Sequence, residues 1–323
     1  MDECARKDFI SNLPHGIIEI ILTKLPIRDA VRTSVLSTEW RYRWATMTIL
    51  VFDKNCVCVP HGSIFNEEKL FNFMLRCLFL HDGPINKFRL STSCLDKYPD
   101  MDQCLLFLSR KHLKELVLKI DLLDPMLPAP SAIFSCQRLT SLTLCGFELK
   151  PPLTFRGFPC LKYLKLDYDI VTREVVEDLI SGSPLLEKLK ILNYEHLAFM
   201  VRAPNLKHLI LDGNFKHIYV EHAPLLVDIS IEIDTEVSEV PNLQKLQISA
   251  EAFGCAFFKP AGTGFWEKGC PTDFTMKHLK KVQISGVSNK KDMEFIKFVL
   301  GRSPVLKVMR VSHHDNSNDN MKN

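Results

Sequence analysis

Residues 161–166 read LKYLKL, with leucine at the first, fourth and sixth positions. The same pattern returns along the chain, with Ile, Val, Met or Phe replacing some of the leucines. The starts of successive copies are 17 to 36 residues apart. Ten copies are found, and they begin at Ile85, Leu113, Leu139, Leu161, Leu186, Leu206, Leu226, Leu243, Leu279 and Leu306.

The spacing inside each copy indicates a short strand. Its fourth and sixth residues point to one face of the strand, and its first residue anchors the preceding turn. A single strand cannot bury that face, whereas parallel strands stacked side by side can. The period therefore predicts an α/β leucine-rich-repeat solenoid, with parallel strands on the concave side and helices and coil on the convex side.

The segments between copies carry signals for turns and helices. Stretches 171–184 and 291–304 have apolar residues at helical spacing and reach Gly182 and Gly301 near their ends, which predicts a helix in each. Prolines stand just before the first leucine of several copies, where a fixed φ and a missing amide end the preceding segment. These are Pro159, Pro184, Pro204, Pro224, Pro241 and Pro304.

Function is expected between the leucines, because the leucines form the core. Strand alternation places the fifth residue of the nine copies from Leu113 onward on the concave face, with the seventh residue beside it. We predict that this face holds a protein or peptide partner, since it mixes both charges with neutral and apolar positions. The candidate residues are Val117, Thr143, Lys165, Lys190, Ile210, Ser230, Gln247, Gln283 and Arg310. Regularity fails at the aromatic loop 252–271, for which packing and binding are both open.

A different pattern occupies the start of the chain. Residues 12–31 read NLPHGIIEIILTKLPIRDAV, and their isoleucines and leucines cover nearly half of a helical wheel. One side of such a helix can serve a small core of its own. The other side must be covered by something else.

Residues 8–44 resemble an F-box. The resemblance rests on Leu13-Pro14, Leu25-Pro26 and the segment VLSTEWRYRW with its Trp40, and only Glu39 departs from the basic residue common at its position. The chain resembles in particular the plant proteins that follow a three-helix F-box with leucine-rich repeats and an FBD region. The FBD resemblance covers 265–311, in the segments FWEKGCP, HLKKVQISG and FIKFVLGRSPVLKVMRV.

This resemblance implies a non-catalytic substrate-recognition subunit of a Skp–cullin–F-box (SCF) ubiquitin ligase. The F-box would dock on a Skp-type adaptor, and the repeats would hold the protein to be ubiquitinated. The adaptor surface, shared in part with the domain's own core, would comprise Leu13, Pro14, Ile17, Ile18, Ile21, Leu22, Leu25, Pro26, Ala30, Val31, Val35, Leu36 and Trp40.

The resulting domain plan has five regions. We expect an F-box at 8–48, a connecting segment at 49–84, leucine-rich repeats at 85–250, an FBD region continuing the solenoid at 251–312 and a disordered tail at 313–323.

Composition narrows the function further. The 323 residues are 46% hydrophobic and 24% charged with a net charge of +3, a profile of folded proteins that gives no strong field for nucleic acid. A signal peptide and membrane-spanning stretches are not evident, so we expect the cytoplasm or nucleus and no membrane partner. The eleven cysteines are expected to be reduced and mostly buried.

Enzymatic motifs and cofactor loops are not found, so we expect no catalytic residue and no cofactor. Cys56, Cys58 and His61 lie close together but lack the fourth ligand of a zinc site, and we expect no metal there. Two alternatives stay open: a leucine-rich-repeat scaffold that joins no ligase, and a small-molecule receptor that uses the concave face as a pocket.

Overall fold

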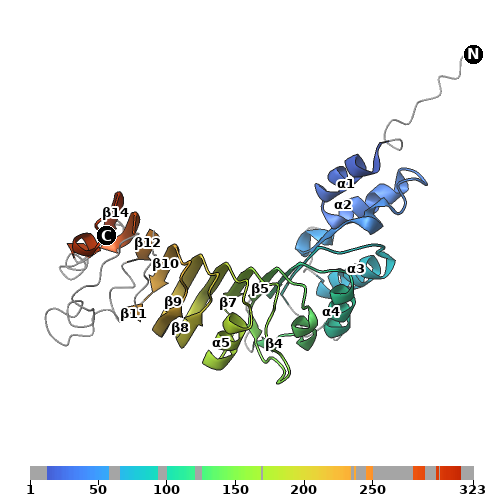
Figure 1. Ribbon diagram of the computed structural model, residues 1–323. Coiled ribbons are helices and arrows are strands. Elements are labelled where there is room, and N and C mark those ends of the chain that lie inside the picture. Colours follow the sequence, from blue (N-terminus) through green and yellow to red (C-terminus); the bar gives the residue numbers. More distant parts are fainter. Residues whose placement is uncertain are drawn as a thin grey trace, which may run out of the picture. The chain divides into compact units, whose positions relative to one another are not determined.

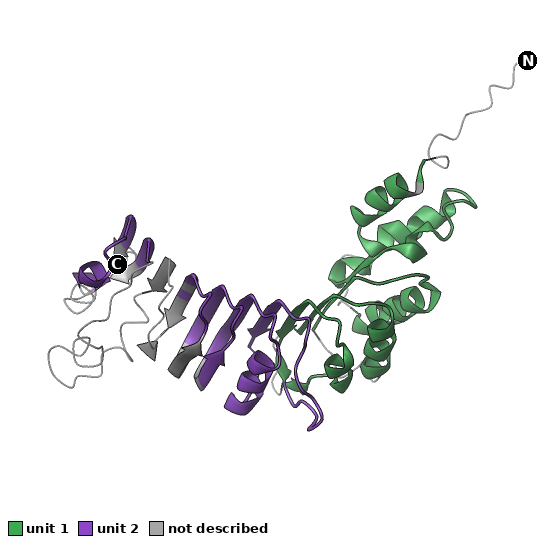
Figure 2. Cartoon of the chain, in the orientation of Figure 1, with its two compact units in different colours: residues 1–148 green, residues 149–323 purple. Residues whose placement is uncertain are grey.

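The computed structural model describes residues 13–57, 66–93, 100–120, 126–168, 170–233, 236–237, 245–249, 279–287, 296–297 and 299–313 (Figure 1). The described chain forms two compact units, residues 1–148 and 149–323 (Figure 2). The aromatic loop 252–271, Pro241 and residues 314–323 of the expected tail lie outside the described residues.

The first unit begins with the helices of the F-box region. They are α1 (His15–Thr23) and α2 (Ile27–Arg32), followed by the 3-10 turns η1 (Thr33–Val35) and η2 (Arg43–Thr46). The third helix of the expected three is thus replaced by two short turns. The run Thr-Ser-Val is β-branched or polar and has low helix propensity, and the Thr33 hydroxyl donates to the Ala30 carbonyl at 2.6 Å.

Parallel strands and helices complete the first unit. The strands β1, β2, β3 and β5 pair in that order, and β4 pairs with β6 separately. Their bounds and those of the helices are β1 (Ile49–Phe52), η3 (Lys54–Cys56), α3 (Glu67–Leu80), β2 (Lys87–Thr92), α4 (Met101–Arg110), β3 (Glu115–Ile120), β4 (Leu127–Pro128), η4 (Ser131–Ser135), β5 (Ser141–Cys145) and β6 (Phe147–Glu148).

Residues 49–84 are therefore part of the strand array and do not merely connect two regions. They contribute β1, which pairs with β2 in parallel, and α3. Residues 47–52, MTILVF, follow the repeat pattern with Met47 in the first position, and this copy is not among the ten that we identified from the sequence. Met47, Leu50 and Phe52 are all buried, as the pattern requires.

The second unit continues the repeat pattern in a parallel sheet. Its strands follow the order β7, β8, β9, β10, β12, β13 and β14, with β11 paired to β9. The bounds are β7 (Tyr163–Asp167), α5 (Arg173–Ser181), β8 (Lys188–Arg202), β9 (His208–His222), β10 (Asp228–Ile233), β11 (Glu236–Val237), β12 (Lys245–Ser249), β13 (Lys281–Val287) and β14 (Val308–His313). This arrangement confirms the α/β fold with an N-terminal helical region and parallel strands.

The pattern residues of the copies from Ile85 to Leu206, and of the copy at Leu279, form the core, as predicted. In the last copy, by contrast, Leu306 and Met309 are half-buried and Val311 is 41% exposed. In the copy at 161–166, Leu161, Leu164 and Leu166 are at most 1% exposed, and the leucines of the copies at 113–118 and 206–211 are equally buried. Residues between them are half-buried on the opposite side of each strand, which we call the open face.

The prolines lie inside the turn that precedes the first leucine of a repeat. In five repeats the first leucine donates its amide to the carbonyl three residues earlier, at 3.0–3.1 Å, and proline occupies the second position of that turn. Proline is favoured there because its fixed φ matches the turn. The donors are Leu161, Leu186, Leu206, Leu226 and Leu306.

Helix α5 lies within the predicted stretch 171–184. Thr172 caps its start by accepting the amide of Val175, and Gly182 is its C-cap. Gly182 has φ −79°, so the left-handed conformation does not explain the glycine. The explanation is close packing, because a Cβ at this position would clash with the Arg156 carbonyl.

A buried carboxylate fixes α3 to the sheet in the first unit. Glu67, in the first turn of α3, accepts hydrogen bonds from the Thr92 hydroxyl at 2.6 Å, the Ser93 amide at 2.8 Å and the Ser93 hydroxyl. Glu67 is only 8% exposed, and its charge also lies at the favourable end of the helix dipole. The carboxylate therefore joins the start of α3 to the end of β2.

Replacing this carboxylate should loosen both elements. We predict that Glu67→Ala lowers the unfolding free energy of the first unit by about 2 kcal/mol, because the buried hydroxyl of Thr92 and the half-buried donors of Ser93 lose their acceptor. Hydrogen–deuterium exchange of the α3 and β2 amides measures this loss. The matched variant Glu68→Ala removes an exposed carboxylate from the same turn and should change exchange little. Equal effects of both variants would contradict the role given to Glu67.

Candidate adaptor site on the F-box and open face of the sheets

Both Leu-Pro pairs start a helix in the same way. Pro14 and Pro26 are the N-cap residues of α1 and α2, and each carbonyl accepts two amides of the first turn at 2.9–3.2 Å. A proline loses nothing at a helix start because no intrahelical partner exists there for its missing amide. The pairs thus set the start of the two helices that carry most of the predicted adaptor residues.

Helix α1 has a buried side and an exposed apolar side. Ile18 and Leu22 are 1% exposed and belong to the core, whereas Ile17, Ile20 and Ile21 are 45%, 58% and 38% exposed. Residues three or four positions apart lie on the same side of a helix. Ile17, Ile20 and Ile21 therefore form one stripe, and Ile18 and Leu22 form another. This division accounts for the broad apolar surface that the sequence shows between Asn12 and Leu25.

The structure separates the predicted adaptor residues by exposure. Ile18, Leu22, Ala30 and Trp40 are buried in the F-box core, Leu13, Leu25 and Val31 are half-buried, and the remaining six are exposed: Pro14, Ile17, Ile21, Pro26, Val35 and Leu36. Val35 is 86% exposed at the end of η1.

Two exposed residues beside this set were not among the predicted ones. Ile20 lies on the outer stripe of α1, and Tyr42 is 65% exposed. The signal for Ile20 was its place at the edge of the apolar arc on the helical wheel. Tyr42 had no comparable signal, because aromatic residues on both sides of it, Trp40 and Trp44, are buried.

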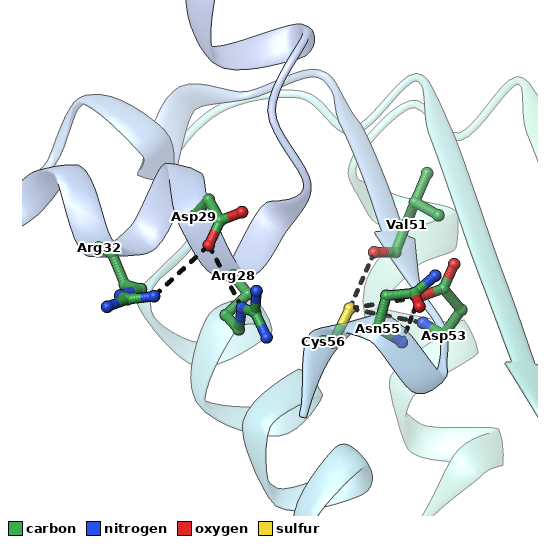
Figure 3. Close-up of polar contacts among 7 residues, drawn as sticks. All are labelled: Arg28, Asp29, Arg32, Val51, Asp53, Asn55 and Cys56. Atoms are coloured by element: carbon green, nitrogen blue, oxygen red, sulfur yellow. Dashed lines mark hydrogen bonds and ion pairs between the residues drawn. The ribbon is translucent and has the colours of Figure 1, made fainter. Parts of the chain in front are cut away.

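Helix α2 presents charge in place of apolar surface. The Asp29 carboxylate lies 3.3 Å from Arg28 Nε and 3.8 Å from Arg32 Nη1 (Figure 3).

Figure 3 also shows the η3 turn, where Asp53 accepts the Asn55 amide at 2.9 Å and the Cys56 thiol lies 3.5 Å from the Val51 carbonyl. Burial raises the pKa of the Cys56 thiol, and the nearby Arg28 charge partly opposes this rise.

The end of the F-box is bonded directly to the strand array. Thr48 O accepts the amides of Asn86 and Lys87 at 2.8 and 3.1 Å, and Ala45 O accepts the Asp82 amide at 2.8 Å. The His81 ring adds a third link, with Nε2 2.9 Å from the Met47 carbonyl. The F-box exit is therefore fixed to the segment between α3 and β2 by backbone hydrogen bonds.

His81 is neutral in this link. The Met47 carbonyl can only accept, so Nε2 carries the proton, and Nδ1 is buried with no partner among the described residues. Burial lowers the pKa of His81, and the Lys111 charge adds to that effect, while the bond to Met47 and the Asp82 charge oppose it. Protonation would bury a cation with one unpaired N–H.

Three further cysteines, Cys77, Cys104 and Cys136, are buried. Burial raises the pKa of Cys77 to about 12 and the pKa values of Cys104 and Cys136 to about 11. These thiols are protonated near neutral pH and are inert as nucleophiles. Of the trio considered for zinc, only Cys56 is described, and the described residues contain no group of three or more metal-binding side chains.

The predicted substrate-face residues fall into rows on the open face. In the first unit Val117 pairs with Thr143, which is itself buried. In the second unit successive strands bring together, in register, Lys165, Lys190, Ile210, Ser230, Gln247, Gln283 and Arg310. Whether this row contacts a target stays a prediction.

Comparison with known proteins agrees with this architecture. The F-box domain family model matches residues 10–52, and the family model for the LRR repeats of FBD-associated F-box protein At5g56370 matches residues 101–246. F-box/FBD/LRR-repeat protein At1g13570 of Arabidopsis thaliana is 38% identical, over 94% of this chain and 91% of its own length. The chain belongs to the F-box/FBD/LRR-repeat family.

More distant relatives share parts of this plan. F-box/LRR-repeat protein 13 of Arabidopsis thaliana is 31% identical over 75% of this chain and 52% of its own length. F-box/LRR-repeat protein At3g26922 of the same plant is 27% identical over 70% of this chain and 75% of its own length. Within the described part of this F-box/FBD/LRR protein, no helix is both long enough and apolar enough to cross a bilayer.

The His81 link predicts a pH dependence of stability. An unfolded chain binds the proton at the ordinary histidine pKa of about 6.5, whereas the folded chain binds it only at a lower pH. The contribution of His81 to stability is therefore intact above about pH 6.5 and is lost as the pH falls below that value. The wild type should lose more stability between pH 7.5 and pH 5.5 than His81→Gln, whose amide can still donate to Met47.

Denaturant unfolding of the two proteins at both pH values measures this difference, with amide exchange at residues 82–87 as a local readout. Other histidines and carboxylates contribute equally to both proteins and cancel in the comparison. Identical pH dependence of the wild type and His81→Gln would show that the ring is not the titrating group.

Proposed function

We propose that this protein is the substrate-recognition subunit of an SCF-type ubiquitin ligase. Its F-box binds a Skp-type adaptor, and its repeats bind the target protein. The transfer chemistry is left to the other subunits, and the chain itself acts without a catalytic site. The observation that carries the proposal is the exposed apolar stripe of α1 inside the region matched by the F-box family.

The energetics of this stripe favour a protein partner. Full burial of an isoleucine side chain is worth roughly 1.5–3 kcal/mol, so covering Ile17, Ile20 and Ile21 provides a substantial part of a typical affinity. Val35 and Leu36, at 86% and 63% exposure, add further apolar surface after α2. Exposed apolar groups gathered in this way are typical of interaction sites.

The hydrogen-bonded exit of the F-box supports an adaptor role. A subunit that presents a target has to hold its two binding regions in a defined relation, and links through Thr48, Ala45 and His81 join the F-box to β2 and α3. The same links would serve a scaffold outside any ligase, so adaptor binding is what separates the two functions. We further propose that the protein acts in the cytoplasm or nucleus.

Truncating the exposed stripe should weaken adaptor binding without unfolding the protein. We predict that Ile17→Ala/Ile21→Ala raises the Kd for a plant Skp-type adaptor at least thirtyfold, about 2 kcal/mol, as expected for interface hot spots. Isothermal titration of the full chain with purified adaptor measures the Kd. The thermal midpoint of the Ile17→Ala/Ile21→Ala protein should move little, because both side chains already contact water.

Two matched variants make the result specific. Leu153→Ala removes a side chain that is 98% exposed in the second unit and should leave adaptor binding unchanged. Leu22→Ala removes a buried side chain of the same helix and should cost about 2–5 kcal/mol of stability. Failure of the wild type to bind the adaptor would overturn the ligase function in favour of a scaffold.

A further inference from the structure

Three lysines gather on the open face where the second unit begins. Lys165 on β7 pairs in register with Lys190 on β8, and Lys188 lies two residues before Lys190 on the same face. Buried leucines alternate with them, so all three side chains project from one side of the sheet. We call these residues the lysine cluster.

One of the three charges is neutralised inside the protein. Lys165 Nζ lies 2.7 Å from Asp167 Oδ2 on the same strand. The other oxygen of Asp167 accepts the Asn193 side-chain amide at 2.7 Å. Asp167 is therefore fully engaged by Lys165 and Asn193.

Lys188 and Lys190 have no carboxylate within 4.0 Å among the described residues. The register neighbours of Lys188 are Tyr163 and His208, and those of Lys190 are Lys165 and Ile210. His208 is directed to Asp228, with Nδ1 3.5 Å from Oδ2. The register neighbours of the two lysines thus include no carboxylate; of the acidic residues on the flanking strands, Asp167 is bound by Lys165 and Asn193, and Asp212 lies opposite Leu192.

Holding these charges together works against stability. Burial lowers the pKa of Lys190, and the charges of Lys188 and Lys165 lower it further. A neutral residue at this position would avoid both the partial desolvation and the repulsion. Charges that repel one another and find no partner in the fold are characteristic of binding sites.

Apolar residues border the lysine cluster on the same face. Leu192 follows Lys190 on β8, and Ile210 lies beside Lys190 on β9; both are half-buried. Acidic residues follow on the next strands, Asp212 on β9 and Asp228 on β10. A long polyanion would be repelled there, whereas a segment with one acidic side chain beside an apolar one would match the surface.

We propose that the lysine cluster receives a carboxylate side chain of the target protein, with an adjacent apolar side chain of the target on Leu192 and Ile210. The inference rests on the proposed function, because it names the chemistry of the target that the open face holds. The ammonium groups of Lys188 and Lys190 supply the ion pair that the fold itself does not, and Asp167 keeps Lys165 in place beside them.

A peptide-display selection against the full-length protein tests the proposal. We expect random heptapeptides selected on the wild type to be enriched in Asp or Glu next to an apolar residue, and we expect this enrichment to be absent on Lys188→Gln/Lys190→Gln. The matched variant Lys162→Gln/Lys207→Gln removes two lysines that both pair with Glu187, at 3.6 and 2.8 Å, and should keep the enrichment. It controls for net charge.

Affinity is then measured by fluorescence anisotropy at about 0.1 M salt with a selected acidic peptide and its Asn or Gln counterpart. Lys188→Gln/Lys190→Gln should weaken binding of the acidic peptide at least tenfold, and Lys162→Gln/Lys207→Gln less than twofold. The thermal midpoint of Lys188→Gln/Lys190→Gln should be unchanged or higher, because a repulsion is removed.

Several outcomes would overturn the proposal. They are selection without acidic enrichment, equal enrichment on the wild type and Lys188→Gln/Lys190→Gln, and tenfold tighter binding of a phosphoserine peptide or single-stranded DNA than of the acidic peptide. Adaptor binding is measured on the same proteins and should be equal for all three. Loss of adaptor binding by the wild type would reject the ligase function, whereas loss of the acidic preference alone would reject only the lysine cluster as its target site.

Discussion

A carbonyl that accepts two amides from the next repeat sets the register of the parallel strands in each unit. Lys114 O accepts the amides of Thr140 and Ser141, and Lys162 O accepts those of Glu187 and Lys188, at 2.8–3.0 Å. The same pairing recurs at Asn86, Glu187 and Lys207. Each such carbonyl fixes the entry of the following strand, and a slip of one residue would turn the buried leucines outward. The core and the open face both depend on this bond.

The repeat pattern predicts which residues are buried and which share a face, but it does not predict contacts between residues of different repeats. The leucines of the pattern mark the buried positions, and two-residue alternation brings Lys165, Lys190 and Ile210 into one row, because side-chain period and register are fixed together. The role of Gly182 was not predictable, since it depends on the Arg156 carbonyl of an earlier repeat. Lys190 lacks a carboxylate partner among the described residues, and this too depends on its neighbours in space, Lys165 and Ile210.

The F-box shows a further limit of sequence reasoning. All isoleucines of α1 are chemically equal in the sequence, and the packing of α1 against α2 and η2 decides which of them become core. The expected third helix gives way to η1 and η2, because β-branched and polar residues follow Arg32. The exposed set is therefore smaller than the predicted one, and it also includes Ile20 and Tyr42.

The Thr48 carbonyl, at the end of the F-box, accepts the amides of Asn86 and Lys87 in the same way as the carbonyls that join successive repeats. Strand β1, which follows directly, pairs on one side with β2, and α2 contacts it from the F-box. Deleting residues up to 48 would leave the Asn86 and Lys87 amides without their acceptor and would remove the contact of α2 with β1, the first strand of the sheet. Open strand edges recruit other chains. Point substitutions on α1 are thus a safer way to separate target capture from adaptor binding than truncation.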